Sequence, residues 1–510
     1  MRGWLTAAAP AASMAASMLA HADVQPPSAF DVIEKSVPEL SSAMAAGTVT
    51  SKGLVQAYLA RVDAYDRTFP ALNAMIALNP RALDEAEALD RERASGRVRG
   101  PLHGIPIVVK DNYDTADMPT TAGSVALKGS LPERDGFQVR KLRAAGAVIV
   151  GKTNLHEFAR GITTISSLGG QTRNPYDPLR NPGGSSGGTG AAVAANFAAF
   201  GMGTDTCGSI RYPSAHNSLV GVRPTMGLSS RSGIVPLALS QDVAGPLART
   251  VIDVAIALDA TVGVDPDDPA TAASAGHMPP SYAAALARAS LHDSRIGALL
   301  PLFGTAPEDQ RAGSVVRTAL AELESGGARV AQIATDPLPA EGDVSVIRYE
   351  FKFNLDAYLR GTPRAPVRSL AEILDKGVYL RALEQAFRGS NAVATLDSEE
   401  YRAARARQTA LRTRLLSLLD DNRVDALAYP TVRRTAAKIG EPQQGGNCAA
   451  SAASGLPAVT VPAGFADDGM PVGIEFLGRP FSELDLLRIA SAYEQATHHR
   501  HPPSLTPKRP

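Results

Sequence analysis

The sequence has very little cysteine: Cys207 and Cys448 are the only two among 510 residues. Two cysteines cannot form the disulfide framework of a small secreted domain, so we predict no such framework and two buried thiols instead. They are also too few for a tetrahedral zinc site built from cysteines. His498, His499 and His501 lie in a polar tail that is typical of solvated surface. We therefore predict no metal and no cofactor.

The sequence also lacks an excess of either charge. Its 51 Lys and Arg residues balance 51 Asp and Glu residues, which gives a formal net charge of +0 at pH 7. Without a basic surplus or a polybasic run, we expect no binding of nucleic acid or of an anionic membrane. No segment after the N-terminal stretch offers the ~18 continuous apolar residues of a stable membrane span. The expected partner is a small molecule or a short peptide, and the protein is expected to be a monomer or a homodimer.

What the sequence does contain is typical of a folded α/β enzyme with many loops. Apolar residues make up 44% of the chain, aromatic residues only 5%, and there are 45 Gly and 37 Pro. The length allows two to four domains or one large α/β unit.

The N-terminus carries the pattern of a secretory signal. Residues 1–22 combine one arginine with an Ala-rich apolar stretch and end in Ala20-His21-Ala22, a small-x-small cleavage site. We therefore predict removal of residues 1–22 and a periplasmic or secreted protein that begins at Asp23. The alternative is an Ala-rich leader without this role, which would leave the protein in the cytoplasm.

Apolar spacing predicts an alternation of helices and strands. Two helices are expected within 34–66 and another at 82–94, and a helix at 136–145 lies between short apolar runs at 105–109 and 147–150 that are typical of buried strands. This alternation predicts an α/β sheet. Further helices are expected at 191–199, 251–262 and 482–496, and further strands at 295–300, 426–429, 458–461 and 472–476. Because strands return near the C-terminus, we expect both ends of the chain to build one sheet.

The segment 282–420 is mostly helical in pattern and charged, and it follows a linker-like stretch at 265–281. We expect this segment to determine substrate specificity. Its alternating aromatic residues at 349–353 could line a pocket, but packing in the core is the favoured interpretation.

Lys110 ends the predicted buried strand at 105–109, an unusual position for a charged residue. Burial there could lower its pKa from ~10.4 to roughly 7–8, which would allow the amine to act as a base at neutral pH. Two alternatives are an ion pair between Lys110 and Asp111, and Lys152 as the base instead.

Two serine segments follow. Ser185 and Ser186 lie among the four glycines of 183–188, directly before a predicted helix whose free N–H groups favour negative charge. The segment matches a G-x-S-x-G nucleophile elbow but lacks the preceding strand, and it lacks the Lys-Ser/Thr ending of a phosphate-binding loop. Ser209 ends a turn of small residues at 203–211, where consecutive backbone N–H groups could form an oxyanion hole.

These segments together resemble the amidase signature family. The matching motifs are Val-Val-Lys-Asp-Asn at 108–112, Gly-Gly-Ser-Ser-Gly-Gly at 183–188 and Asp-Thr-Cys-Gly-Ser-Ile-Arg at 205–211. The resemblance spans about 35–500, and the stretches 169–176 and 349–352 look most like its bacterial peptide amidase branch. It implies one catalytic domain over 23–510, an α/β fold in which helices cover a mixed β-sheet.

The resemblance also implies roles for individual residues. Ser209 is the expected nucleophile, Ser185 the bridging serine preceded by a cis peptide bond, and Lys110 the base. The expected oxyanion donors are the backbone N–H groups of Thr206, Cys207, Gly208 and Ser209, and the supporting residues are Ser186, Asp205 and Arg211, the last two as a buried pair or loop anchors. Cys207 stands where the family usually has glycine, so its side chain enters the turn, and it is an alternative nucleophile.

The implied reaction is the hydrolysis of a carboxylic amide through an acyl-enzyme, without a cofactor. Amidated peptides are the substrates of the most similar branch, while aryl acylamides, carbamates and esters suit the same chemistry. Two rival functions stay open: a glutaminase subunit of a tRNA-dependent amidotransferase, and a binding module without activity.

Overall fold

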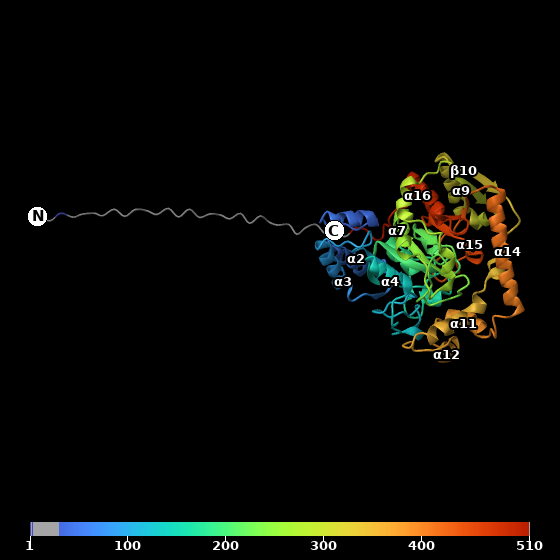
Figure 1. Cartoon of the computed structure of the whole chain (residues 1–510), viewed down its shortest axis with the longest axis horizontal. Coiled ribbons are helices and arrows are strands. Elements are labelled where there is room, and N and C mark those ends of the chain that lie inside the picture. The colour runs from blue at the N-terminus through green and yellow to red at the C-terminus, as the bar shows by residue number, and fades with distance from the viewer. Residues whose placement is uncertain (2, 4–29, 509–510) are drawn as a thin grey trace.

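The computed structural model describes residues 1, 3 and 30–508, and helices surround a large sheet within them (Figure 1). The predicted signal peptide and its cleavage after Ala22 lie, apart from residues 1 and 3, outside the described residues. Helices α2 (Ser51–Tyr65) and α3 (Ala82–Ala94) lie on one side of the molecule, and the long helix α14 (Glu399–Asp421) lies on the opposite side. The α/β fold with a helix-covered mixed sheet is confirmed.

One sheet of the described region has eleven strands in the order β1-β3-β2-β6-β8-β7-β12-β13-β11-β9-β10. The N-terminal and C-terminal strands meet where β7 pairs antiparallel with β12, at Val222 opposite Val459. Both ends of the chain therefore build one sheet, as predicted. The strands are β1 Met75–Leu78, β2 Pro106–Lys110, β3 Val148–Thr153, β6 Phe200–Asp205, β7 Val220–Arg223, β8 Val243–Ala248, β9 Arg295–Leu299, β10 Arg329–Ile333, β11 Ala426–Pro430, β12 Ala458–Phe465 and β13 Pro471–Leu477, with β4 Ile165–Ser166 and β5 Gly170–Gln171 as a separate pair.

Strand β2 is buried on both faces. Successive side chains of a strand point to opposite faces. Accordingly, Ile107 and Val109 pack in the largest apolar cluster, and Val108 packs in a second one that includes residues of α2 and α3. Because β2 lies between β3 and β6 and pairs parallel with both, its last residue, Lys110, lies inside the protein.

The predicted helices at both ends of the chain are confirmed within a few residues. Helix α1 (Val37–Ala45) begins with a capping box, in which Ser36 and Glu39 exchange side-chain and backbone hydrogen bonds. The remaining α-helices of the described region are α4 Phe137–Ala144, α5 Gly187–Ala194, α6 Arg211–His216, α7 Val251–Thr261, α8 Tyr282–Ala285, α9 Gln310–Ser325, α10 Glu341–Val344, α11 Ile347–Arg360, α12 Leu370–Lys376, α13 Glu384–Asn391, α15 Ala449–Ser454 and α16 Glu483–Thr497.

The glycine-rich centre of the chain differs from the prediction. Helix α5 begins at Gly187 rather than near Ala191, and the strand β6 that follows was not predicted. The glycines explain both differences, because they lower the helix and strand propensities of these segments. Here they allow close approach: a Cβ at Gly188 would collide with the Asn154 backbone, and one at Gly201 with the Thr189 side chain.

The aromatic residues at 349–353 lie on helix α11, where Tyr349 and Phe353 are half-buried and Phe351 belongs to the core. Phe351 is fully buried, and its ring centroid lies 6.0 Å from that of Phe158 and 5.5 Å from that of Phe387. For Phe351, packing in the core is confirmed.

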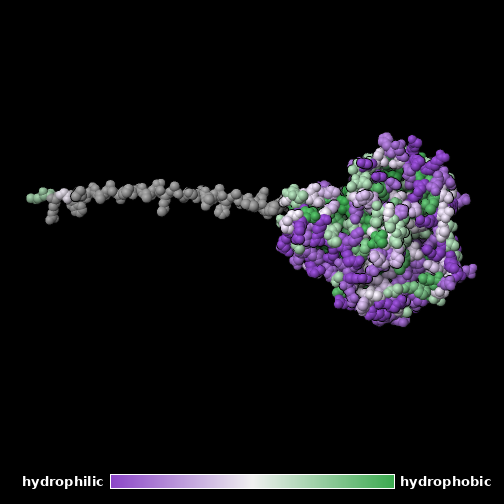
Figure 2. Space-filling model, viewed as in Figure 1, coloured by the Kyte–Doolittle hydropathy of each residue, from purple (hydrophilic) through white to green (hydrophobic). Residues whose placement is uncertain are grey.

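In the described part of the chain, no helix has both the length and the apolar character required to cross a membrane. On the face shown in Figure 2, hydrophilic residues predominate along the edges, and apolar residues lie among them nearer the middle.

A buried carboxyl group on α16 gives a stability prediction. Glu494 accepts hydrogen bonds from the backbone N–H of Val251 at 3.0 and 3.2 Å, and burial raises the pKa of Glu494 to about 8. Because the pKa of this acid is higher in the folded than in the unfolded protein, the folded state favours the protonated form. Its contribution to the free energy of unfolding therefore falls as pH rises from 4.5 to 8. We expect Glu494→Gln to raise the free energy of unfolding by at least ~1 kcal/mol above pH 8 and by little below pH 4.5. Denaturant titrations at both pH values check this, and an equal effect at both would contradict it.

Candidate active site

Lys110 is fully buried and touches two hydroxyl groups. Its Nζ lies 2.7 Å from Ser185 Oγ and 2.7 Å from Thr204 Oγ1, and Thr204 Oγ1 also accepts a hydrogen bond of 3.1 Å from Asn112 Nδ2. Burial lowers the pKa of Lys110 to about 7, although the charges of Asp205 and Asp242 oppose this shift. A large fraction of the amine is therefore neutral at pH 7 and able to accept a proton.

One ion pair bears on both alternatives to Lys110 as the base, which are a Lys110–Asp111 ion pair and Lys152 as the base. Asp111 pairs with Lys152, whose Nζ lies 3.1 Å from Asp111 Oδ1, and both side chains are buried. Lys152 Nζ also donates to Pro119 O and Thr120 Oγ1. Among residues 30–508, no acidic side chain forms an ion pair with Lys110. The alternative of a Lys110–Asp111 ion pair is absent, and Lys152 has the contacts of a structural residue.

The segment around Ser185 is tightly packed. The Gly184–Ser185 peptide bond is cis, as the resemblance implies. A Cβ at Gly184 would lie 2.7 Å from the Ile162 carbonyl carbon, so a side chain at 184 would not fit. The backbone N–H of His156 donates to Ser185 O at 3.0 Å, and this hydrogen bond also holds the segment in place.

His156 lies beside the serine segment, and within residues 30–508 its ring forms no hydrogen bond with a serine hydroxyl. Its ring Nδ1 lies 3.3 Å from the backbone N of Thr163 and 3.4 Å from Thr163 Oγ1. Burial, together with the charge of Lys110, lowers the pKa of His156 to about 4, so the ring is neutral at pH 7.

Ser186 connects the serine segment to the turn that carries Ser209. The backbone N–H of Ser186 donates to Ser209 O at 3.2 Å, and Ser186 Oγ donates to Thr204 O at 3.2 Å. Ser209 itself is 3% exposed. The structure thus brings Lys110, Ser185 and Ser209 into one small region, between the end of β2, the start of α5 and the turn after β6.

Asp205 shapes the turn from 205 to 211. Its carboxylate accepts hydrogen bonds from the backbone N–H groups of Gly208 at 2.8 Å and Ile210 at 3.1 Å, and Gly208 has a φ of +86° that favours glycine. The N–H of Gly208 is therefore occupied by Asp205. The backbone N–H groups of Thr206, Cys207 and Ser209 donate no hydrogen bond to any described residue, which leaves three donors of the expected four free.

A fully buried ion network lies behind this turn. Arg211 Nε lies 3.0 Å from Asp205 Oδ2, Arg211 Nη1 lies 2.6 Å from Glu475 Oε1, and Arg223 Nη1 lies 3.0 Å from Asp205 Oδ1. Burial opposes ionisation of Asp205, but the two guanidinium groups hold its pKa well below the usual range. Asp205 and Arg211 are thus loop anchors, as predicted, while sequence reasoning gave no role to Arg223 and missed Glu475, which comes from β13.

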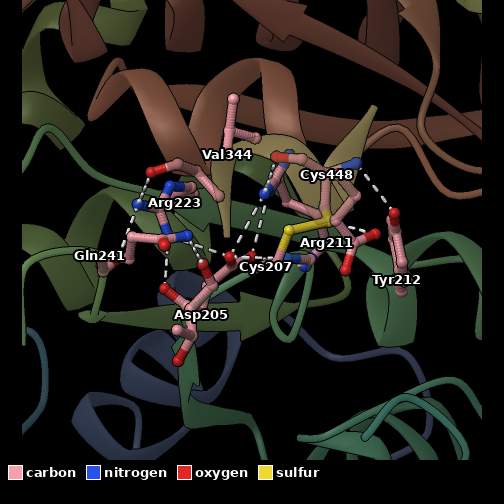
Figure 3. Close-up of a disulfide and its surroundings, with 12 residues drawn as sticks. Asp205, Cys207, Arg211, Tyr212, Arg223, Gln241, Val344 and Cys448 are labelled. Atoms are coloured by element: carbon pink, nitrogen blue, oxygen red, sulfur yellow. Dashed lines mark hydrogen bonds and ion pairs between the residues drawn. A yellow bond between two sulfur atoms is a disulfide. The ribbon is translucent and has the colours of Figure 1, made fainter. Parts of the chain in front are cut away.

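The prediction of two free thiols is wrong. Cys207 and Cys448 form a disulfide that joins the turn to the start of α15, with a Cα–Cα distance of 5.0 Å (Figure 3). A hydrogen bond lies beside the disulfide: the hydroxyl of Tyr212, on α6 directly after the turn, accepts from the Cys448 backbone N–H at 2.8 Å. The pair is separated by 241 residues, so no local pattern indicated it. A disulfide sulfur is not a thiolate, so in this state Cys207 is not a nucleophile.

Comparisons with known proteins identify relatives of this chain. A family model described as Amidase matches residues 53–487. A probable amidase from Arabidopsis thaliana is 36% identical over 498 residues, covering 94% of this chain and 93% of that protein. A glutamyl-tRNA(Gln) amidotransferase subunit from Moorella thermoacetica is also 36% identical, covering 92% and 98%. The crystal structure of the native peptide amidase from Stenotrophomonas maltophilia matches with a TM-score of 0.85 and 42% identity, covering 93% of this chain and 99% of that one.

Proposed function

The chain belongs to the amidase signature family, a family of hydrolases that act on carbon–nitrogen bonds, and from this premise we propose that it cleaves linear amides with a Ser-Ser-Lys relay. The observation that carries the proposal is the contact of 2.7 Å between Lys110 Nζ and Ser185 Oγ, made by a buried lysine without an acidic partner among the described residues. A buried amine with a lowered pKa beside a hydroxyl group is suited to proton transfer.

In the proposed reaction, Ser209 Oγ attacks the carbonyl carbon of the amide. Its proton passes to Ser185 Oγ while Ser185 passes its own proton to Lys110 Nζ. The free N–H groups of Thr206, Cys207 and Ser209 stabilise the negative charge on the carbonyl oxygen. The proton then returns through Ser185 to the leaving amine, and the C–N bond breaks to leave an acyl-enzyme. Water attacks the acyl-enzyme by the same route and releases the carboxylic acid.

Amidated peptides are the proposed substrate class, because the peptide amidase of Stenotrophomonas maltophilia is 42% identical to this chain over nearly its whole length. Aryl acylamides, carbamates and esters remain alternatives with the same acyl chemistry. We further propose that the protein acts outside the cytoplasm, on the basis of the signal pattern at 1–22.

A second candidate is a glutaminase subunit of a tRNA-dependent amidotransferase, which the similarity to the Moorella protein supports. The predicted cleavage before Asp23 argues against it, since such a complex works beside tRNA in the cytosol. Mass analysis of the protein from a native extract separates the two: an N-terminus at Asp23 supports the amidase, while an intact Met1 with co-purifying subunits supports the glutaminase.

The substrate class is tested with a panel of peptide amides, anilides, carbamates and esters, whose acid and amine products are followed by mass spectrometry. We expect hydrolysis of peptide amides by the isolated chain, unchanged in the presence of a metal chelator. Turnover that requires another protein, or that stops with the chelator, would contradict the proposal.

A further inference from the structure

Glu341 is an unpaired carboxylate beside the turn that carries Ser209. It is the first residue of α10, and its Oε2 lies 3.5 Å from Cys448 Sγ. An oxygen of its carboxylate is also within 4.8 Å of Cys207 Sγ. The side chain is exposed, and no ion pair within residues 30–508 includes it.

The sulfur atoms do not satisfy this carboxylate. Because Cys207 and Cys448 form a disulfide, neither carries the S–H that could donate to Glu341, nor the thiolate that would hold a metal with it. The surrounding protein partly desolvates the carboxyl group and raises the pKa of Glu341. Within the described residues the carboxylate therefore has no ion-pair partner, and it is open to solvent.

Hydrogen bonds fix α10 relative to the turn. Gln241 Nε2 donates to Thr206 O at 3.2 Å, and Gln241 Oε1 accepts from the backbone N–H of Val346 at 3.2 Å. Gln408 Nε2 donates to Gln241 Oε1 at 3.1 Å and to Val344 O at 2.7 Å. Figure 3 shows Gln241 and Val344 beside the turn. The backbone that carries Glu341 is therefore held at a set position next to the proposed oxyanion donors.

The charge of Glu341 has a consequence for catalysis. A negative charge near the point where an oxyanion forms disfavours that oxyanion, unless a positive charge compensates it. None of the described lysine, arginine or histidine side chains forms an ion pair with Glu341, so the described part of the protein does not compensate this charge through an ion pair.

We propose that Glu341 binds an ammonium or guanidinium group of the substrate, so that the enzyme prefers amides with a positive charge near the scissile bond. Peptide amides with a lysine or arginine, or with a free α-amino group, next to the amide have this chemistry. The inference rests on the proposed amide hydrolysis and adds its substrate class.

The test compares a lysine-containing peptide amide with the same peptide in which norleucine replaces lysine. We expect wild-type kcat/KM to favour the lysine peptide by about 10- to 100-fold, the range of a hydrogen bond to a charged group. Glu341→Gln should remove this preference by raising KM for the lysine peptide alone. Asp343→Asn, which removes an exposed carboxylate from the same helix, should keep the preference. An equal preference in wild type and Glu341→Gln would overturn the inference.

A binding measurement separates this inference from the proposed reaction. Calorimetric titration of both peptides into Ser209→Ala, and into the same variant with Glu341→Gln, needs no turnover. Tighter binding of the lysine peptide that disappears with Glu341→Gln would support the inference even if neither peptide were hydrolysed. Equal affinity of Ser209→Ala for both peptides would overturn it.

Discussion

Ser209→Ala is expected to lower kcat on the order of 10⁵-fold, because it removes the oxygen that forms the acyl-enzyme. Ser209 is nearly buried in a turn whose backbone is held by Asp205. The substitution deletes one oxygen atom there, so the fold should persist. Steady-state kinetics on the best peptide amide measure the loss, and the thermal unfolding midpoint should stay within a few degrees of the wild type.

The neighbouring serine provides the matched control for this variant. Ser186 Oγ donates to the backbone oxygen of Thr204 and accepts from the Thr204 backbone N–H, so Ser186→Ala should cost these two hydrogen bonds and about 10-fold in rate. Equal turnover by wild type and Ser209→Ala would discard Ser209 as the nucleophile and direct attention to Ser185. A larger loss in Ser186→Ala than in Ser209→Ala would reverse the assigned roles.

Lys110→Ala is the second variant with a large expected effect, a loss of about 10³- to 10⁴-fold in kcat/KM. Without the amine, the proton of Ser185 has no acceptor within the relay. The wild-type enzyme should also show a characteristic pH dependence. Because the pKa of Lys110 is lowered to about 7, log kcat/KM should rise with pH below 7 and level off above it.

The pH dependence separates a base from a merely structural lysine. Lys110→Ala should lose the inflection near pH 7 together with the rate. A near-native rate at neutral pH, or an unchanged pH profile at a reduced rate, would contradict the assignment of Lys110 as the base. Circular dichroism controls for folding, because removal of a buried side chain leaves a cavity.

The residues of the proposed relay could be selected from the sequence because each lies in a short, distinctive segment. Lys110 ends an apolar run, Ser185 lies among glycines, and Ser209 ends a turn of small residues. The order of these segments along the chain carried the resemblance to the family. The two-faced burial of β2 also followed from its continuous apolar residues.

The parts that could not be predicted depend on contacts between distant segments. The Cys207–Cys448 disulfide joins residues 241 positions apart. The ion pair of Arg211 with Glu475 likewise depends on β13, a strand near the C-terminus. Strand β6 was missed because its two glycines lower the local strand propensity. Only the fold shows that Gly201 makes room for Thr189 of α5. Glu341 has no surrounding motif at all, and only the fold brings it beside the turn.

The most direct test of the relay is to identify the acylated residue. The enzyme is mixed with an activated ester or anilide, quenched with acid during turnover, digested and analysed by mass spectrometry. We predict the acyl mass on Ser209 in the wild type and a much smaller amount in Lys110→Ala. An acyl group on Ser185 or on another residue, or undiminished acylation in Lys110→Ala, would contradict the proposed relay.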